Sequence, residues 1–196
     1  MKNTMNDIVK MLLFLIIIGT FFTSSLVLMD GYTEPIIERN EIIKMKSGVL
    51  NALQIPFTSE TLDERFSAHV EQTEIGERTV YVTKEGAVAV PYNGSGLWGP
   101  IIGVLAVDPE TDRIRGLTII QQEETPGLGG RIAEDEYLGQ FTNKRFSPEL
   151  ELKPEGRAEG ENEIDAITGA TLSSKAFVKI LNEEYSRYKE LYEEQS

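Results

Sequence analysis

The 196-residue chain contains no cysteine, one histidine and one tryptophan. Without cysteine it cannot form disulfides, thiolate-bound iron–sulfur clusters, a C-x-x-C-H haem attachment or a lipidated N-terminal cysteine. A single histidine is too few for a zinc site of the Cys/His type. That histidine, His69, lies in an ordinary helical stretch, where a surface or capping role is commoner than a catalytic one. The sequence therefore predicts no metal site and no catalytic residue of its own.

Basic side chains are also scarce relative to acidic ones. The chain has 19 basic and 32 acidic side chains. Only two of the basic and one of the acidic side chains precede Met29, so the remainder carries a net charge of −14. Such a segment is repelled by nucleic acid and by anionic lipid headgroups. The excess also fits a well-solvated surface, and we expect no nucleic-acid partner.

One long uncharged run stands near the N-terminus. Residues 11–29 read MLLFLIIIGTFFTSSLVLM, and 19 helical residues span about 28 Å, close to the hydrocarbon thickness of a bilayer. A cleaved signal peptide is the alternative, but no A-x-A-like site follows the run. The sequence predicts a cytoplasmic segment at 1–10, a retained membrane anchor at 11–29 and an extracytoplasmic domain at 30–196. Lys2 and Lys10 before the span, and Asp30 and Glu34 after it, favour this orientation by the positive-inside rule.

The remaining pattern predicts an α+β domain whose largely antiparallel sheet is flanked by helices. Glu34-Pro35 is expected to be a short link, and Pro56 to end the helix that follows it. Residues 147–163 are expected to be a surface loop. The predicted helices are residues 36–53, 61–70, 131–141 and 172–192, and the predicted strands are residues 78–83, 86–90, 101–107 and 114–120.

The segment Asp165-Ala166-Ile167-Thr168-Gly169-Ala170-Thr171 precedes the clearest helical pattern. It places a hydroxyl beside two small residues at a predicted helix start, where unpaired N–H groups and a partial positive charge favour an anion. This arrangement suits covalent attachment of a phosphate-bearing cofactor at Thr171. The alternative is that Thr171, Ser173 or Ser174 only caps the helix.

Two glycine-rich stretches are further candidates. Residues 94–99 fit G-x-G-x-x-G by letter, but Pro100 and an apolar strand-like run follow, so we reject a dinucleotide-binding fold and expect a glycine turn. This turn carries Trp98, which is either a core or lid aromatic or a flat wall for an aromatic ligand. Residues 124–130 read ETPGLGG and follow a predicted strand. They form either a wide turn or a loop that approaches a ligand closely.

Taken together, three motifs resemble the FMN-binding domain family of respiratory redox pumps. They are Gly96-Leu97-Trp98-Gly99, the E-T-P-G-L-G loop that begins at Glu124, and the segment D-A-I-T-G-A-T from Asp165 to Thr171 at the start of the predicted helix. Their order behind an N-terminal anchor is similar to the C component of the sodium-translocating NADH:quinone reductase and to the G component of the Rnf ferredoxin:NAD oxidoreductase. The first two motifs favour the quinone-reductase branch, whereas the chain length favours the Rnf branch.

The resemblance implies FMN joined through its phosphate to the Thr171 oxygen, in an electron-relaying subunit that is not catalytic alone. It implies attachment by a flavin transferase, the other subunits of a membrane pump as partners, contact with membrane lipid, and a place in the bacterial inner membrane. Asp165 would assist the transferase. The implied FMN-binding residues are Trp98, Glu124, Thr125, Gly127, Leu128, Gly129, Asp165, Thr168, Gly169, Ala170, Thr171, Leu172 and Ser173.

Two other functions fit the sequence. An anchored extracytoplasmic binding or scaffold module would have the same anchor and acidic surface without a flavin. A stand-alone flavoprotein that serves an extracellular reductase would carry the flavin without the pump subunits. Flavin absorbance separates the first from the family function, and co-purifying subunits separate the second.

Overall fold

The computed structural model describes residues 2–195, and the side chains of residues 6–194. Met1 and Ser196, the outer ends of the predicted 1–10 and 30–196 segments, lie outside the described residues. The side chain of Lys2, on which the predicted orientation partly depends, also lies outside them. The chain forms two compact units, residues 1–43 and 44–196. This division does not test the predicted membrane boundary at residues 29 and 30.

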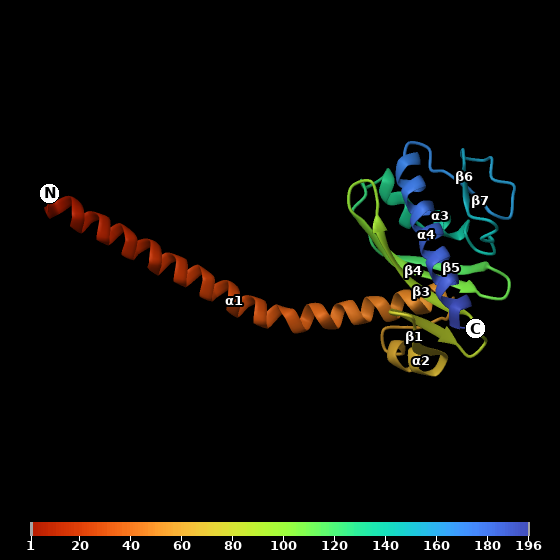
Figure 1. Cartoon of the computed structure of the whole chain (residues 1–196), viewed down its shortest axis with the longest axis horizontal. Helices are drawn as coiled ribbons and strands as arrows, with labels where there is room; N and C mark the ends of the chain where they lie inside the picture. The colour runs from red at the N-terminus through yellow and green to blue at the C-terminus, as the bar shows by residue number, and fades with distance from the viewer. Residues whose placement is uncertain (1, 196) are drawn as a thin grey trace. The chain divides into compact units, whose positions relative to one another are not determined.

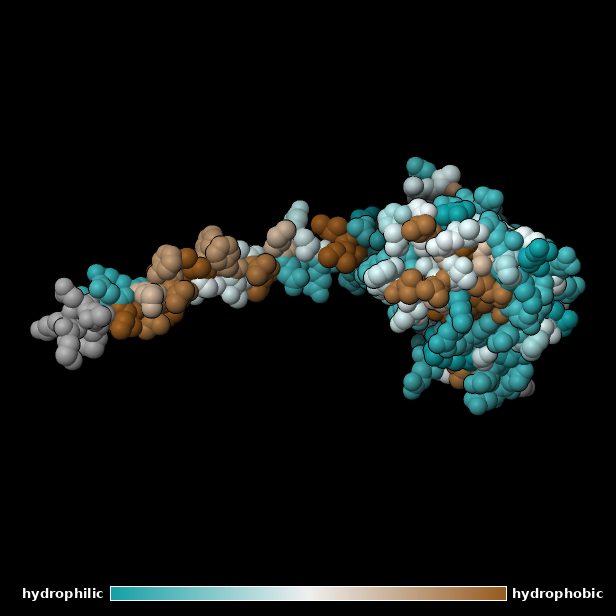
Figure 2. All heavy atoms as spheres, turned by 90° about the horizontal axis from the view of Figure 1, so that it is seen from above, coloured by the Kyte–Doolittle hydropathy of each residue, from teal (hydrophilic) through white to brown (hydrophobic). Residues whose placement is uncertain are grey.

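The first unit is a single helix. Helix α1 (Lys2–Ala52) continues into the second unit and is long and apolar enough, by length and composition, to cross a membrane. Brown apolar atoms cover much of its described N-terminal half in Figure 2. The predicted link at Pro35 is wrong, because the helix passes through this residue. The Thr33 hydroxyl donates to the Met29 and Asp30 carbonyls at 3.0 and 3.3 Å, in the turn that precedes the proline.

The end of this helix, predicted at residue 53 ahead of Pro56, lies at Ala52. Gln54 adopts a φ of 59°, and its N–H bonds to the Asn51 carbonyl at 3.0 Å. The Ile55 N–H reaches the Leu50 carbonyl at 2.9 Å. These two bonds form a Schellman motif, which satisfies the last carbonyls of the helix before the proline is reached.

The second unit is an α+β domain, as predicted (Figure 1). Its five-stranded sheet is antiparallel throughout, in the order β1-β2-β3-β4-β5. A separate pair, β6 and β7, is parallel. The remaining elements of the unit are α2 (Leu62–His69), β1 (Val70–Ile75), β2 (Arg78–Thr83), β3 (Val88–Ser95), β4 (Pro100–Asp108), β5 (Arg113–Gln121), the 3-10 helix η1 (Gly129–Ala133), α3 (Asp135–Gly139), β6 (Glu151–Lys153), β7 (Glu163–Asp165) and α4 (Thr171–Gln195).

Three local predictions differ from this structure. Strand β1 was not predicted, since only its end residues Val70 and Ile75 are buried. The helix expected at 131–141 is two short pieces, η1 and α3. The loop expected at 147–163 contains β6 and begins β7. Each of these strands is only three residues long, too short for a period to be read.

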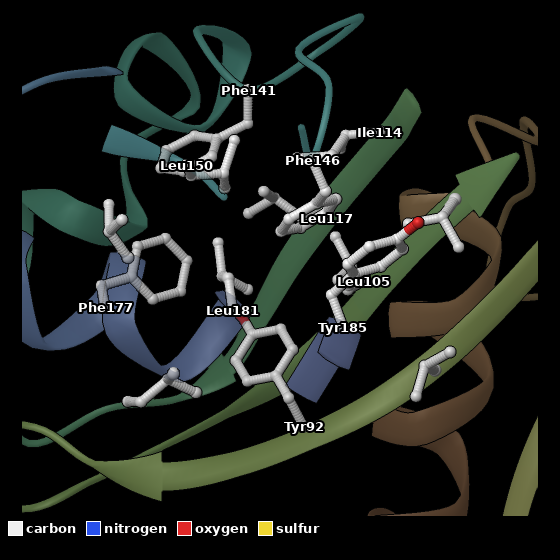
Figure 3. Packing of buried hydrophobic residues seen from close by; sticks show 14 of the residues in the cluster. Tyr92, Leu105, Ile114, Leu117, Phe141, Phe146, Leu150, Phe177, Leu181 and Tyr185 are labelled. Atoms are coloured by element: carbon white, nitrogen blue, oxygen red, sulfur yellow. The ribbon is translucent and has the colours of Figure 1, made fainter. Parts of the chain in front are cut away.

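Each face of the sheet carries its own apolar cluster. Helix α4 covers one face with Phe177 and Leu181, as Figure 3 shows. The last turns of α1 and the Phe66 side chain of α2 cover the other face. Alternate side chains of β3 and β4 enter opposite clusters, as the two-residue period of a strand requires. Residues 44–196 therefore form three layers, with the sheet in the middle.

The aromatic core fixes α4 against the sheet. Phe177 is fully buried and packs against the rings of Tyr92, Tyr137 and Phe141, with centroids 5.6–6.4 Å apart. Tyr92 lies over its cross-strand partner Gly103, where an added Cβ would come within 2.3 Å of the phenol oxygen. Burial raises the pKa of Tyr92 well above its ordinary value. The Tyr92 hydroxyl donates to the Thr118 carbonyl at 3.1 Å.

Candidate functional site

The predicted attachment residue is the first residue of α4. Thr171 is exposed, and it follows Gly169, whose φ is 82°. An added Cβ at Gly169 would meet only Leu128 at 3.6 Å, an ordinary contact. Glycine is therefore required here by the backbone conformation and not by lack of space. The turn presents the Thr171 side chain at the surface.

The first turn of α4 keeps its backbone donors open. The Ser174 N–H bonds to the Ala170 carbonyl at 3.0 Å, which begins the helical ladder. Within residues 2–195, no protein atom accepts a hydrogen bond from the N–H groups of Thr171, Leu172 or Ser173. The residue before the helix, Ala170, has no side-chain acceptor. A helix start with open N–H groups can stabilise an anion.

The nearby serine hydroxyls do not cap the helix, contrary to the alternative prediction. The Ser173 hydroxyl donates to Glu124 Oε2 at 2.6 Å. The Ser174 hydroxyl donates to the Ala170 carbonyl at 3.1 Å and accepts from the Ile167 N–H at 3.1 Å. Both hydroxyls therefore hold the preceding turn and the neighbouring loop in place, and Thr171 lies within the helix and not at its cap position.

Glu124 joins the three predicted motifs. This residue is buried, with only 3% of its surface exposed. Oε1 accepts from the N–H groups of Leu97 and Trp98 at 2.7 and 3.1 Å, while Oε2 accepts from Ser173. Sequence reasoning expected this side chain to line the flavin ring. Its two oxygens are instead occupied by protein donors.

Two glycines make room for this carboxylate. A Cβ added at Gly96 would lie 2.4 Å from Glu124 Oε1. One added at Gly129 would lie 2.5 Å from the Ser173 hydroxyl and 2.8 Å from Glu124 Oε2. The glycines of the first two motifs therefore permit a close approach to the buried carboxylate, whereas the prediction for the second motif was a close approach to a ligand.

The first motif is the tip of the β3–β4 hairpin. Gly96 and Gly99 close a two-residue turn through an N–H···O bond of 2.8 Å, and Ser95 pairs with Pro100 across it. The expected glycine turn is thus confirmed, and no helix opens here. Leu97 and Trp98 occupy the turn and are 46% and 71% exposed. Trp98 is therefore not a core residue, which leaves a lid aromatic and a wall for an aromatic ligand as the two alternatives.

The second motif is a compact turn that leads into η1. The Thr125 carbonyl accepts from the N–H groups of Leu128 and Gly130 at 3.1 and 2.9 Å. Gly127 has a φ of 74°. The Thr125 side chain is exposed, and the side chain of Leu128, half exposed, lies beside Gly169. The turn thus brings an apolar side chain to the attachment segment.

Asp165 organises a neighbouring loop. Its Oδ1 accepts from the N–H groups of Arg157 and Ala158 at 2.9 and 2.8 Å, and its own N–H donates to Gln140 Oε1 at 3.1 Å. Burial opposes ionisation, but the backbone hydrogen bonds outweigh it and lower the pKa of Asp165. The acidic residue of the third motif therefore fixes the strand that precedes the attachment turn.

Two grooves border the site. One groove, of about 430 Å³, is lined by Thr171, Gly169 and Thr168. Its other wall is residues 152–155, which form the end of β6 and the two residues that follow it. The second, of about 470 Å³, is lined by residues 93–100. Sequence reasoning missed residues 152–155, which it placed in a surface loop. Lys153 in this stretch is held by Glu151 and Glu163 at 2.7 and 3.0 Å.

The groups around Thr171 suit a flavin nucleotide. Open N–H groups match a phosphate, and four large apolar side chains are exposed on the segments that Glu124 ties together. Apolar and aromatic surfaces suit a flat ring system, with a few polar groups to orient it. The four side chains are Leu97, Trp98, Leu128 and Leu172.

Known proteins resemble this region in sequence and in fold. Residues 96–186 match the FMN-binding domain family. The resemblance predicted from the three motifs is confirmed over that segment, which contains all the predicted site residues and supports FMN as the ligand.

Sequence relatives include the C component of the Na(+)-translocating NADH-quinone reductase of Pasteurella multocida strain Pm70. It is 36% identical over 105 residues, covering 48% of this chain and 40% of that protein. The corresponding component from Neisseria meningitidis serogroup B is 34% identical over 97 residues, covering 47% and 38%. The chain thus spans about two fifths of the length of these relatives.

Solved structures share the fold. NqrC of Shewanella oneidensis aligns with a TM-score of 0.64 at 19% identity, over 75% of this chain and 91% of that chain. The C component of the Na(+)-translocating NADH-quinone reductase of Parabacteroides distasonis aligns with a TM-score of 0.68 at 21% identity, over 80% and 95%. These alignments confirm the predicted α+β fold.

Proposed function

We propose that this chain is the membrane-anchored, electron-relaying subunit of an ion-translocating NADH:quinone oxidoreductase, with FMN attached to Thr171 by a phosphoester. The observation that carries the proposal is the exposed residue Thr171 at a helix start whose first three N–H groups have no acceptor among the described residues. The sequence relatives, which are named as the C component of the sodium-translocating enzyme, favour this complex over the Rnf complex.

The chain's own groups would hold and orient the cofactor. FMN supplies reversible uptake and release of electrons. Thr171 provides the covalent tether, and the α4 N-terminus stabilises the negative charge left on the phosphodiester. Leu97, Trp98, Leu128 and Leu172 offer apolar surface to the ring and restrict its access to water.

Attachment needs an activated phosphate donor. The Thr171 hydroxyl oxygen loses its proton and forms a bond to phosphorus, so a leaving group must depart from that phosphorus with the electron pair. A phosphoanhydride such as a flavin dinucleotide would supply this leaving group in the form of a nucleoside monophosphate. No described side chain forms a hydrogen bond with the Thr171 hydroxyl, so we assign its deprotonation to a flavin transferase.

The proposed location follows from α1. Its apolar stretch would cross the bacterial inner membrane once, in contact with lipid, with the N-terminus in the cytoplasm and the flavin domain outside. The other partners would be the remaining subunits of the pump. Co-purification with several polytopic subunits tests this arrangement and separates the complex from a stand-alone flavoprotein.

The decisive experiment is mass spectrometry of the full chain purified from cells that contain a flavin transferase. Trypsin releases residues 158–175, a peptide that contains Thr168 and Thr171. We expect this peptide to carry the mass of FMN less water, with fragment ions that assign it to Thr171. Thr171→Ala should abolish the adduct, and Thr168→Ser, which keeps a hydroxyl at the exposed motif position three residues earlier, should retain it. A colourless protein with an unmodified peptide would favour the anchored binding module instead.

A further inference from the structure

We propose that Glu124 is a positioning residue that couples the Trp98 hairpin tip to the first turn of α4. The inference rests on the proposed function in one respect: the purpose of the coupling would be to fix the distance between the indole ring and the flavin tether. The coupling itself is a property of the protein without cofactor.

The geometry of the carboxylate carries the proposal. One oxygen receives both N–H groups of the hairpin turn, and the other receives the hydroxyl of Ser173, 49 residues along the chain. Glu124 is the acceptor that the structure gives the N–H groups of Leu97 and Trp98. The other hydrogen bond of the turn, from the Gly96 N–H to the Gly99 carbonyl, lies within the hairpin itself. Without the carboxylate, the tip would be tied only to its own strands.

The burial of the Glu124 carboxylate also supports the coupling. In the described part of the chain, no lysine, arginine or histidine forms an ion pair with Glu124. An ionised carboxylate that is only 3% exposed is costly unless hydrogen bonds replace its water. Three donors supply that replacement, and the nearby positive end of α4 adds to it. An apolar residue would fill the same space at lower cost, but it would leave the hairpin N–H groups and Ser173 without this shared acceptor.

The sequence around the carboxylate is adapted to the same contact. Gly96 approaches one oxygen and Gly129 approaches the other, and a methyl group at either position would overlap them. Both glycines therefore serve the coupling and are not direct determinants of flavin contact. Ser173, drawn toward Glu124, is also kept from the N–H groups of the first turn, which remain open to an anion.

Trp98 makes the coupling measurable, because it is the only tryptophan of the chain. The experiment uses the full chain produced without flavin transferase and records the fluorescence anisotropy of Trp98 and its quenching by acrylamide. We expect Glu124→Ala to lower the anisotropy, because the tip can then open locally, and to raise the quenching constant only slightly, because Trp98 is already 71% exposed. Glu110→Ala, which removes an exposed carboxylate from the β4–β5 turn, should change neither.

The conservative variant separates positioning from charge. In Glu124→Gln the amide oxygen can accept from both hairpin N–H groups, while its NH₂ donates to the Ser173 oxygen. We therefore expect Glu124→Gln to retain most of the wild-type anisotropy. Ser173→Ala should loosen the tip less than Glu124→Ala, and adding it to Glu124→Ala should have little further effect, since both remove the same link.

Circular dichroism of each variant checks that the domain is folded at the temperature of the measurement. If Glu124→Ala does not fold, Ser173→Ala tests the same link, since it removes the hydroxyl that α4 donates to the carboxylate. Unchanged anisotropy in a folded Glu124→Ala variant or, failing that, in Ser173→Ala would overturn the coupling. That result would leave the FMN–Thr171 linkage intact, and an absent linkage would not alter the fluorescence test, so the two proposals fail separately.

Discussion

The two ends of α4 are built in opposite ways. At its C-terminal half, buried Glu184 pairs with Arg78, while Tyr185 and Lys189 both bond to Asp112 of the β4–β5 turn. At its N-terminal end, Thr171 and Leu172 are exposed and the first N–H groups have no protein acceptor among the described residues. One helix thus separates two requirements, because polar contacts are completed where the helix is anchored and left open where a ligand would bind.

The core between the two ends should give the largest effect on stability. Phe177→Ala removes a fully buried ring that touches three other aromatic residues. We expect a loss of about 3–5 kcal/mol in the free energy of unfolding, from lost burial and from the cavity left behind. Denaturant unfolding followed by circular dichroism measures it. Leu172→Ala, at the exposed end of the same helix, should change the value by less than about 0.5 kcal/mol.

Breaking the ion pair at the anchored end should have an intermediate effect. Glu184→Ala leaves Arg78, whose side chain is about one third exposed, without its carboxylate partner. Because water can still reach the guanidinium, we expect a loss of about 1–2 kcal/mol, below the usual penalty for a fully buried charge. The same unfolding experiment measures it, with Glu183→Ala on the exposed face as the control. Equal effects of the two substitutions would contradict the contrast between the buried and the exposed face.

The anchored end should also respond to acid. Burial would raise the pKa of Asp112, but hydrogen bonds from Lys189 and Tyr185 outweigh it, so the pKa in the folded protein is lowered. Such a group stabilises the fold above its unfolded pKa of about 3.9, and this contribution is lost as pH falls below that value through the folded pKa. Asp112→Asn should weaken this acid dependence, by up to about 1 kcal/mol for a partly exposed pair. Stability curves between neutral and acidic pH compare the two proteins.

At the open end, the effect on stability should be the smallest. Thr171→Ala removes an exposed hydroxyl that has no hydrogen-bond partner among the described residues, so we expect a change within about 0.5 kcal/mol. If this substitution destabilised the unloaded protein as strongly as Glu184→Ala, the attachment end would be part of the structural framework. Unfolding of the protein made without flavin transferase supplies the comparison.

The helical stripe of α4 could be read from the sequence because Phe177, Ile180, Leu181 and Tyr188 repeat with the helical period and all face the core. The hairpin tip and the attachment turn were predictable from their glycines. Strand β1 was not, because its central residues are polar and exposed, and its pairing with β2 alone makes it a strand. The role of Glu124 was also hidden, since it depends on a contact 49 residues distant.

The phenol ring of Tyr92 over Gly103 has a consequence for how the sequence can change. The ring fills the space that a side chain at residue 103 would need, and the Thr118 carbonyl lies closer still, 2.0 Å from an added Cβ. A smaller residue at position 92 would therefore open only part of that space. A side chain at position 103 therefore requires both a smaller residue at position 92 and a shift of the neighbouring strand.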